Sequence, residues 1–246
     1  MRYQRVLLKL SGQAVSGDQD VGFDPRALEH VADEVLALHA AGVQVSVVIG
    51  GGNIFRGNLG AQWGIERAEA DNIGMMGTLI NSLLLRGVLT ARSNGGAEVR
   101  VMSAIPINNL AEPFIRLRAV HHLDNDYIVV FASGTGNPFV TTDYTAAQRA
   151  IETRSDALLF AKNRARGIFT ADPQKDPEAR LFRRVRYNTI LHQELTIIDQ
   201  PSVILARDHD LPCHVFDFTD KGTILRICQG EDLGTLIDDM SEDVLE

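Results

Sequence analysis

Short apolar runs alternate with longer segments of helical periodicity along most of the chain. The runs typical of buried strands are residues 6–10, 43–49, 99–105, 128–131, 157–161 and 213–216, with 234–237 expected to close the sheet. The segments with helical spacing are 25–41, 71–92, 142–153 and 202–208, with a short helix after Gly222. This alternation predicts an α/β fold in which helices cover both faces of a mainly parallel sheet.

The first long helix has clear start and stop signals. Asp24 is suited to cap its N-terminus, Pro25 suits the first helical position, and Phe23 can pack on Leu28. Gly42 is placed to end it. Helix 71–92 is apolar around much of its circumference, which predicts that it is buried. The acidic residues 238–246 are expected to fray.

Composition narrows the class of protein. A chain of 246 residues suits one α/β domain or two small lobes that share a sheet, and we expect a single domain over 1–246. The formal charge of −8 argues against a nucleic-acid-binding surface, which is usually basic. Cys213 and Cys228 show no metal-binding or redox spacing. We find no export signal and no window of about 20 apolar residues, so we expect a cytoplasmic protein without membrane spans.

Three glycine-bearing turns follow predicted strands, at residues 9–12, 50–53 and 134–137. In a parallel sheet these turns lie at the carboxyl edge, where open α/β folds bind ligands. Glycine lets backbone N–H groups approach phosphate oxygens closely, and helices that start beyond the turns add positive dipoles. One such turn can be purely structural, but three together predict a polyphosphate site.

Charged residues near these turns support a phosphate site, and each has a simpler interpretation. Lys9 ends an apolar strand, where an ammonium without an anionic partner is costly to desolvate, but it could also reach solvent. Arg56 could bind phosphate with its planar guanidinium, or be an ordinary surface arginine. Asp143 could be a helix N-cap, and Asp199 a loop carboxylate.

Several familiar phosphoryl-transfer and metal patterns are absent from the sequence. It contains no G-x-x-x-x-G-K-[ST] run and no protein-kinase H-R-D or D-F-G signature. Its seven histidines form no metal-ligand pattern. The residues alone therefore indicate an α/β enzyme that handles a nucleotide or phosphate, without naming the acceptor.

Several motifs match a known family in chain order. The matching stretches are 7–12, 48–57, 102–106, 134–139, 141–143, 169–173, 175–177 and 205–208 before Leu211-Pro212. They include Lys9-Leu10-Ser11-Gly12 and Gly50-Gly51-Gly52-Asn53. On these stretches, which span nearly the whole chain, the sequence resembles the bacterial uridylate (UMP) kinases of the amino acid kinase superfamily. The resemblance implies a three-layer fold and transfer of the ATP γ-phosphoryl group to UMP in pyrimidine nucleotide synthesis.

The resemblance also implies roles for individual residues. Catalytic roles fall on Lys9, Arg56, Asp143 and Asp199, the two carboxylates ordering the lysine and a Mg²⁺ ion carried by ATP rather than held by protein ligands. The residues implied for ATP are Lys9, Ser11, Gly12, Gly52, Arg56, Asn163, Phe169 and Asp172. Those implied for UMP are Gly51, Asp71 at the ribose, Thr135, Gly136, Asn137 and Thr142. The N-terminal part would hold UMP and the transferred phosphoryl group, and the part from about residue 155 mainly ATP.

The same family predicts a homohexamer that GTP activates and UTP inhibits. The chain departs from the family pattern at Gln13, where glutamate is common, and at Arg166, where aspartate is expected. It departs again at residues 199–202, where an Asp-x-Thr-Ala segment is usual. These departures leave two alternatives open: a kinase of this fold with another small acid or nucleotide as acceptor, and a weakly active regulator that binds UMP or UTP.

Overall fold

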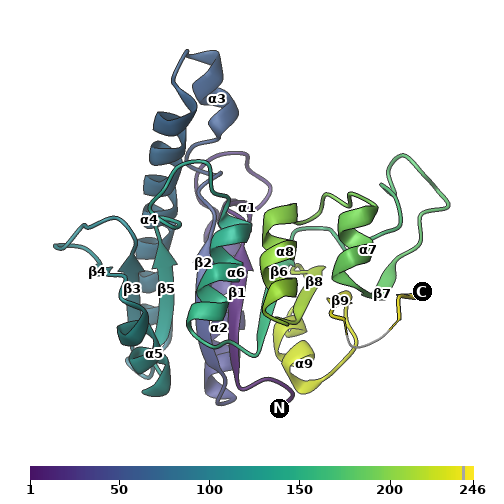
Figure 1. Ribbon diagram of the computed structural model, residues 1–246. Helices are drawn as coiled ribbons and strands as arrows, with labels where there is room; N and C mark the ends of the chain where they lie inside the picture. The colour runs from purple at the N-terminus through teal and green to yellow at the C-terminus, as the bar shows by residue number, and fades with distance from the viewer. Residues whose placement is uncertain (240–241) are drawn as a thin grey trace.

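The computed structural model describes residues 1–239 and 242–246, and a single sheet runs through it (Figure 1). The strands described are β1 Arg5–Leu10, β2 Gln44–Ile49, β3 Val99–Ser103, β4 Glu112–Pro113, β5 Ile128–Ala132, β6 Ala157–Lys162, β7 Phe182–Val185, β8 Cys213–Asp217, β9 Thr235–Ile237 and β10 Val244–Leu245. Their order is β10-β7-β9-β8-β6-β1-β2-β5-β3-β4. The β8–β9 and β10–β7 pairs are antiparallel and the others are parallel. The predicted fold class is confirmed.

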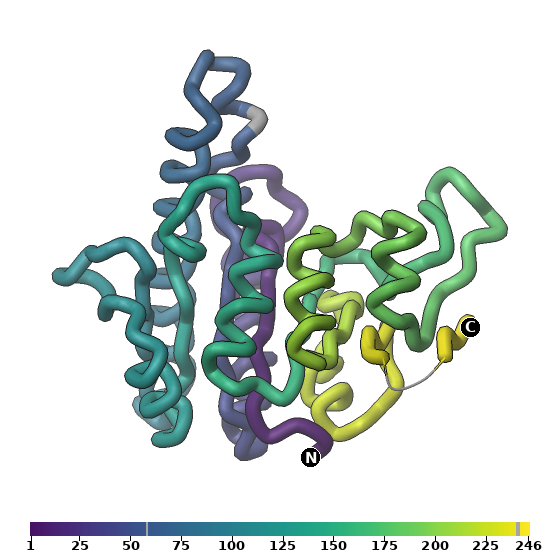
Figure 2. Tube along the Cα trace, in the orientation of Figure 1, coloured from purple at the N-terminus to yellow at the C-terminus, as the bar shows by residue number. Residues whose placement is uncertain are grey.

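Helices cover both faces of this sheet. On one face lie α1 Gln13–Ser16, α2 Pro25–Ala40, α4 Arg67–Arg92 and α9 Thr223–Gln229. On the other lie α5 Arg116–Asp124 and α6 Thr142–Glu152, with α8 Gln200–Asp208 against α6 and α7 Tyr187–His192 against α8. Helix α3 Gly57–Gln62 packs on the start of α4, and α3 and this start of α4 project beyond the sheet edge (Figure 2).

Successive side chains of β1 contribute in turn to the two hydrophobic cores, one on each face of the sheet. Leu8 and Leu10 are buried with α2 and α4, whereas Leu7 is buried in the cluster that includes α5 and α6. Because successive side chains of a strand point to opposite faces, Lys9 lies on the Leu7 face, toward α6. The strand pattern thus places Lys9 on the face that α6 covers, which it shares with Arg5 at the start of the strand.

Most predicted elements are present, and the residues predicted to start and end α2 do so. The Asp24 side chain accepts from the Ala27 N–H at 2.8 Å, and Gly42 has φ +81° beyond α2. Helix α4 begins at Arg67, four residues before the predicted start. Our prediction did not include α3, α5 or α7, whose sequences carry weak periodicity.

The prediction that strand 234–237 closes the sheet is wrong. Strand β9 pairs with both β7 and β8, and β10 adds a further antiparallel strand to β7. The predicted fraying of 238–246 is also wrong for Val244 and Leu245, which form β10. Met240 and Ser241 lie outside the described residues. The sequence pattern missed β10 because a strand of two residues carries no periodicity.

Helix α4 corrects two expectations. With 26 residues and a mean hydropathy of 1.4 over its best window, it is long and apolar enough to cross a membrane, contrary to our estimate. It packs on β3, β5 and α2, however, and a helix that covers a sheet meets the same criterion. It is also not buried all round, since Ile73 and Ile80 are 39% and 45% exposed.

Candidate active site

The three glycine turns meet at one sheet edge, as predicted, and line a single cavity of about 330 Å³. Its walls come from the end of β1, the turns after β1 and β2, α4, and the segment between β5 and α6 with the first turn of α6. The lining residues are Lys9, Ser11, Gly12, Gly50, Gly51, Gly52, Phe55, Gly57, Ala70, Asp71, Gly74, Met75, Thr78, Gly134, Thr135, Asn137, Val140, Thr142 and Thr145.

The middle turn is packed directly against α4. A Cβ on Gly51 would lie 2.5 Å from the Gly74 carbonyl oxygen and 2.9 Å from the Thr78 nitrogen, so only glycine fits. Asn53 and Asn81 exchange amide hydrogen bonds of 3.1 and 2.6 Å, and the Asn81 amide also donates to the Gly50 carbonyl at 2.6 Å. Asn81, which our prediction missed, therefore fixes this turn to the helix.

Lys9 forms an ion pair with Asp143, with Nζ and Oδ1 2.5 Å apart and side chains 8% and 14% exposed. A second ammonium, that of Lys162, lies 3.8 Å from the other Asp143 oxygen and donates to the Ile197 carbonyl at 2.7 Å. Burial opposes ionisation of Asp143, but the two lysines outweigh it, and the pKa of Asp143 lies below its ordinary value. Burial lowers the pKa of Lys162. One carboxylate thus holds two ammonium groups beside the cavity.

Lys162 was missed, although its sequence signal matches that of Lys9. Each is a lysine near the carboxyl end of an apolar strand, and Lys9 pairs in register with Phe160, two residues before Lys162. Because β1 and β6 are neighbours, side chains at these positions point to the same face. A lysine near the carboxyl end of each of two neighbouring parallel strands is thus the sequence signal for this pair.

The two predicted carboxylates have different local roles. The N-cap of α6 is Thr141, whose hydroxyl oxygen accepts from the Tyr144 N–H at 3.1 Å, so Asp143 is free to face Lys9. Asp199 is the N-cap of α8 and accepts from the Ser202 N–H at 2.8 Å. It also accepts from the Thr141 hydroxyl, which ties the starts of the two helices together.

The residues implied for UMP mostly share the main cavity. Gly51, Asp71, Thr135, Asn137 and Thr142 line it. Gly136 does not line it. Its φ of +82° shapes the turn, and a Cβ there would lie 3.4 Å from the Ala104 carbonyl oxygen.

The residues implied for ATP are divided among three cavities. Lys9, Ser11, Gly12 and Gly52 line the main cavity. Phe169 and Asp172 line a cavity of about 400 Å³ between segments 167–173 and 193–197. Asn163 lines a smaller one, of about 220 Å³, with Gln13, Gly17, Asp18 and Arg164.

Arg56 does not line the main cavity. Its Nε donates to the Gly52 carbonyl at 3.3 Å, and its guanidinium lies 3.4 Å from Asp20. With its side chain 48% exposed, it stands at the rim, held by the turn that it follows. Across residues 1–239 and 242–246, we find no group of three or more His, Cys, Asp or Glu placed to hold a metal ion.

A mainly parallel sheet whose glycine turns converge on a buried lysine–aspartate pair defines a phosphate-binding α/β protein. The sequence model of the amino acid kinase family matches residues 4–217. The chain belongs to this family, and within it to the uridylate kinases.

The relatives cover nearly the whole chain. A uridylate kinase from Frankia alni is 52% identical over 237 residues, which are 96% of this chain and 92% of that protein. The structure of a UMP kinase from Bacillus anthracis matches with a TM-score of 0.97 and 54% identity, covering all of both chains. That of a UMP kinase from Ureaplasma parvum matches with a TM-score of 0.89 and 29% identity, covering 97% of this chain and all of that one. The predicted family and three-layer fold are confirmed.

Proposed function

We propose that this protein transfers the γ-phosphoryl group of ATP to UMP, giving ADP and UDP, as a step of pyrimidine nucleotide synthesis. The observation that carries the proposal is the buried Lys9–Asp143 pair beside a cavity lined by three glycine turns. Relatives named uridylate kinase, at about half identity over the full length, support UMP as the acceptor.

The reaction needs positioning and charge stabilisation more than acid–base chemistry. An oxygen of the UMP phosphate attacks the γ-phosphorus of ATP, the bond to the bridging oxygen breaks, and ADP leaves with the electron pair. The attacking oxygen is already deprotonated at neutral pH, so no general base is required. Lys9 and the backbone N–H groups of the turns would stabilise the charge on the transferring group.

We assign UMP to the main cavity, with Gly51, Asp71, Thr135, Asn137 and Thr142 at the ligand. The ATP phosphates would extend from Gly12 and Gly52, with Ser11 beside them. The adenosine would use the cavity of Phe169 and Asp172, with Asn163 nearby. This division supports an N-terminal part for UMP and phosphoryl transfer and a part from about residue 155 for ATP.

A magnesium ion would accompany ATP. Mg²⁺ in such sites binds mainly phosphate oxygens and water, with one or two carboxylates. In this protein ATP would carry the ion, and Asp143 would order Lys9 beside it rather than hold the metal directly. The ion would supply charge neutralisation on the phosphates.

Family membership also supports a cytoplasmic homohexamer that GTP activates and UTP inhibits. One feature of the chain favours assembly. Ile73 and Ile80 of α4 are exposed, and Met76, Leu83 and Leu84 are half-buried at helical spacing along the same side. An apolar stripe of this kind is typical of a subunit interface.

Acceptor specificity tests the proposal. ADP release is measured with ATP, Mg²⁺ and, in turn, UMP, CMP, dUMP or carbamate. We expect turnover to be fastest with UMP. ADP release with carbamate alone would contradict the proposal and indicate a kinase for another small acid, whereas tight UMP binding without ADP release would indicate a regulator.

A further inference from the structure

Asp71 lies at the mouth of the main cavity. Thr78, two turns further along α4, touches the inner end of the cavity, where its hydroxyl oxygen accepts from the Ser133 N–H at 2.8 Å. Seven residues of helix span about 10 Å, so Asp71 stands well outside that point. The Asp71 carboxylate therefore lies at the outer wall of the cavity, whereas Lys9 and the glycine turns line its inner end.

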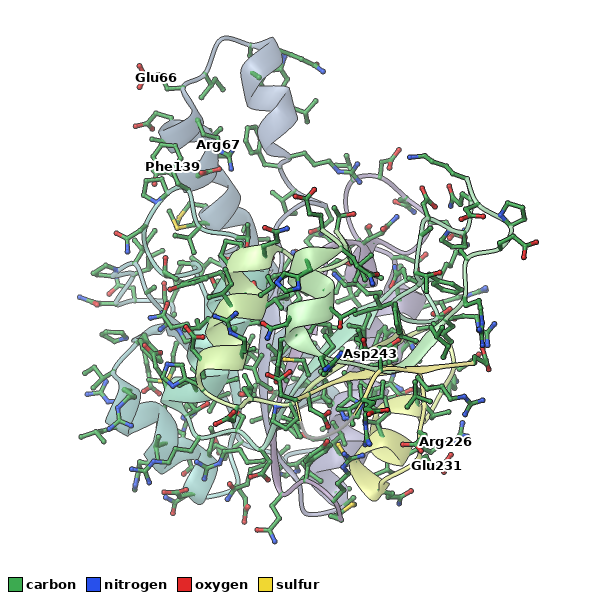
Figure 3. The ribbon with its side chains drawn as sticks, turned by 45° about the vertical axis from the view of Figure 1, so that its right-hand side comes forward. Glu66, Arg67, Phe139, Arg226, Glu231 and Asp243 are labelled. Atoms are coloured by element: carbon green, nitrogen blue, oxygen red, sulfur yellow. The ribbon has the colours of Figure 1, made fainter. Side chains whose placement is uncertain are left out.

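Both oxygens of Asp71 are held by protein donors. The Nε of Arg67, one turn earlier on α4, donates to Oδ1 at 2.8 Å, and the main-chain N–H of Phe139 donates to Oδ2 at 2.8 Å. Figure 3 shows Arg67 and Phe139 next to each other beside α4. The carboxylate consequently joins the helix to the 134–140 segment across the cavity mouth.

The Phe139 contact is made by an unusual backbone. Phe139 has φ +67°, a conformation that is unfavourable for a bulky residue, and its side chain gains little from burial because the residue is 67% exposed. The hydrogen bond from the Phe139 N–H to Asp71 offsets part of the energetic cost of this backbone conformation. Such strain at a cavity wall is typical of a functional site.

The chemistry of a clamped carboxylate limits what it can bind. An ionised carboxylate only accepts hydrogen bonds and repels phosphate, so its ligand partner must be a donor. Its two oxygens offer about four acceptor positions, of which Arg67 and Phe139 occupy two. Two neighbouring hydroxyl groups, as on a ribose, match the remaining two.

We propose that Arg67 is a positioning residue that, together with the Phe139 N–H, orients Asp71 to accept both hydroxyls of a ribose, so that the site selects ribonucleotides over deoxyribonucleotides. This inference rests on the proposed function, because it assumes that the main cavity holds the nucleotide acceptor. Arg67 acts through Asp71 and, with its side chain 66% exposed, can be replaced without disturbing a core.

The test compares UMP with dUMP in Arg67→Met. In the wild type, loss of one hydroxyl bonded to a carboxylate should lower kcat/KM by about tenfold or more. The UMP/dUMP ratio is the kcat/KM for UMP divided by that for dUMP. In Arg67→Met we expect this ratio to fall by about threefold or more, mainly through a higher KM for UMP, with kcat nearly unchanged. Arg67→Lys, which keeps the charge, should recover part of the ratio. Affinities for UMP and dUMP are measured by calorimetry alongside, so the test does not depend on turnover.

Two further variants separate positioning from a general effect. Arg92→Met is the matched control, because Arg92 is a partly exposed arginine of the same helix that pairs with Asp33. Its UMP/dUMP ratio should equal that of the wild type. Arg67→Met combined with Asp71→Asn should have the ratio of Asp71→Asn alone, since both changes act through one carboxylate.

The inference is wrong if the wild type is active but does not distinguish UMP from dUMP, or if Arg67→Met keeps the wild-type ratio in both turnover and affinity. Absence of ADP release with either nucleotide would instead overturn the proposed function. In that case the calorimetric ratio still decides whether Arg67 positions Asp71 for a ribose.

Discussion

At the scale of single residues, the central feature is an ammonium group kept in a buried place. Lys9 is 8% exposed and its ion pair with Asp143 offsets part of the cost of burial. An ammonium has three donors, so Lys9 can bind a ligand oxygen while it keeps Asp143. Its charge is most useful where negative charge spreads over a transferring phosphoryl group.

Replacing Lys9 with alanine should affect turnover much more than binding. We expect kcat to fall by about 100-fold or more, because a donor aimed at the transition state is lost, while UMP affinity changes by less than about threefold. Steady-state kinetics and calorimetry measure the two effects. Lys221→Ala, at an exposed lysine, serves as the control. Near-normal kcat in Lys9→Ala would remove the lysine from the mechanism.

At the scale of elements, residues 243–246 fasten the edge of the sheet. Asp243, labelled in Figure 3, accepts from the Arg186 N–H at 2.8 Å and from the Thr189 hydroxyl at 2.7 Å, and so supports the start of α7. Glu246 lies 3.1 Å from Arg166 and 3.2 Å from Arg183. Arg166, the departure from the family pattern, is therefore used in a contact with this segment.

Asp243→Asn should lower stability in a pH-dependent way. Partial burial opposes ionisation of Asp243, but hydrogen bonds from Thr189 and Arg186 outweigh it and lower its pKa. Stability from such a group is fully present above the unfolded pKa of about 3.9 and is lost as pH falls through the lower folded pKa. We expect a loss of about 1 kcal/mol at pH 7, equivalent to about 2–4 °C in Tm.

Thermal unfolding of wild type and Asp243→Asn between pH 7 and pH 3 measures this effect. The difference in Tm should shrink below about pH 4, where the Asp243 carboxyl of the unfolded wild-type chain takes up a proton and that of the native state follows at its lower pKa. Glu242→Gln changes the net charge equally at the neighbouring exposed position and is the control. A difference that persists unchanged to pH 3 would show that charge is not the cause.

At the scale of the whole molecule, one hydrophobic core lies on each face of the sheet. Helix α4 contributes one side to a core and exposes the other side to solvent. Its inner side packs on β3 and β5, and its outer side presents Ile73 and Ile80. Subunit association would bury these residues and remove their exposure to water. We therefore expect any self-association through α4 to use this outer surface rather than the cavity.

Ile80→Asp should weaken self-association, because an interface that covers α4 would have to bury a charge. We expect sedimentation to show a smaller species than the wild type at the same concentration, with unchanged circular dichroism. Leu117→Asp, at a residue of α5 that is 65% exposed, is the matched control and should leave the assembly intact. An unchanged sedimentation coefficient in Ile80→Asp would place any interface elsewhere.

The sequence by itself determined the local structure and the general place of the site. Asp24 and Gly42 bound α2 because caps and left-handed turns depend on a few adjacent residues. The glycine turns could be predicted to meet because the carboxyl ends of parallel strands share one edge. Arrangements of this kind follow from chain order and side-chain period alone.

Only the tertiary structure decided which side chains meet. Asp143 faces Lys9 from 134 positions along the chain, and Lys162 joins them because β6 lies beside β1. Arg56 lies outside the cavity although its turn lines it, because the side chain is held by Gly52 and Asp20. Such contacts depend on strand order and on competition between partners far apart in sequence, and no local pattern records either.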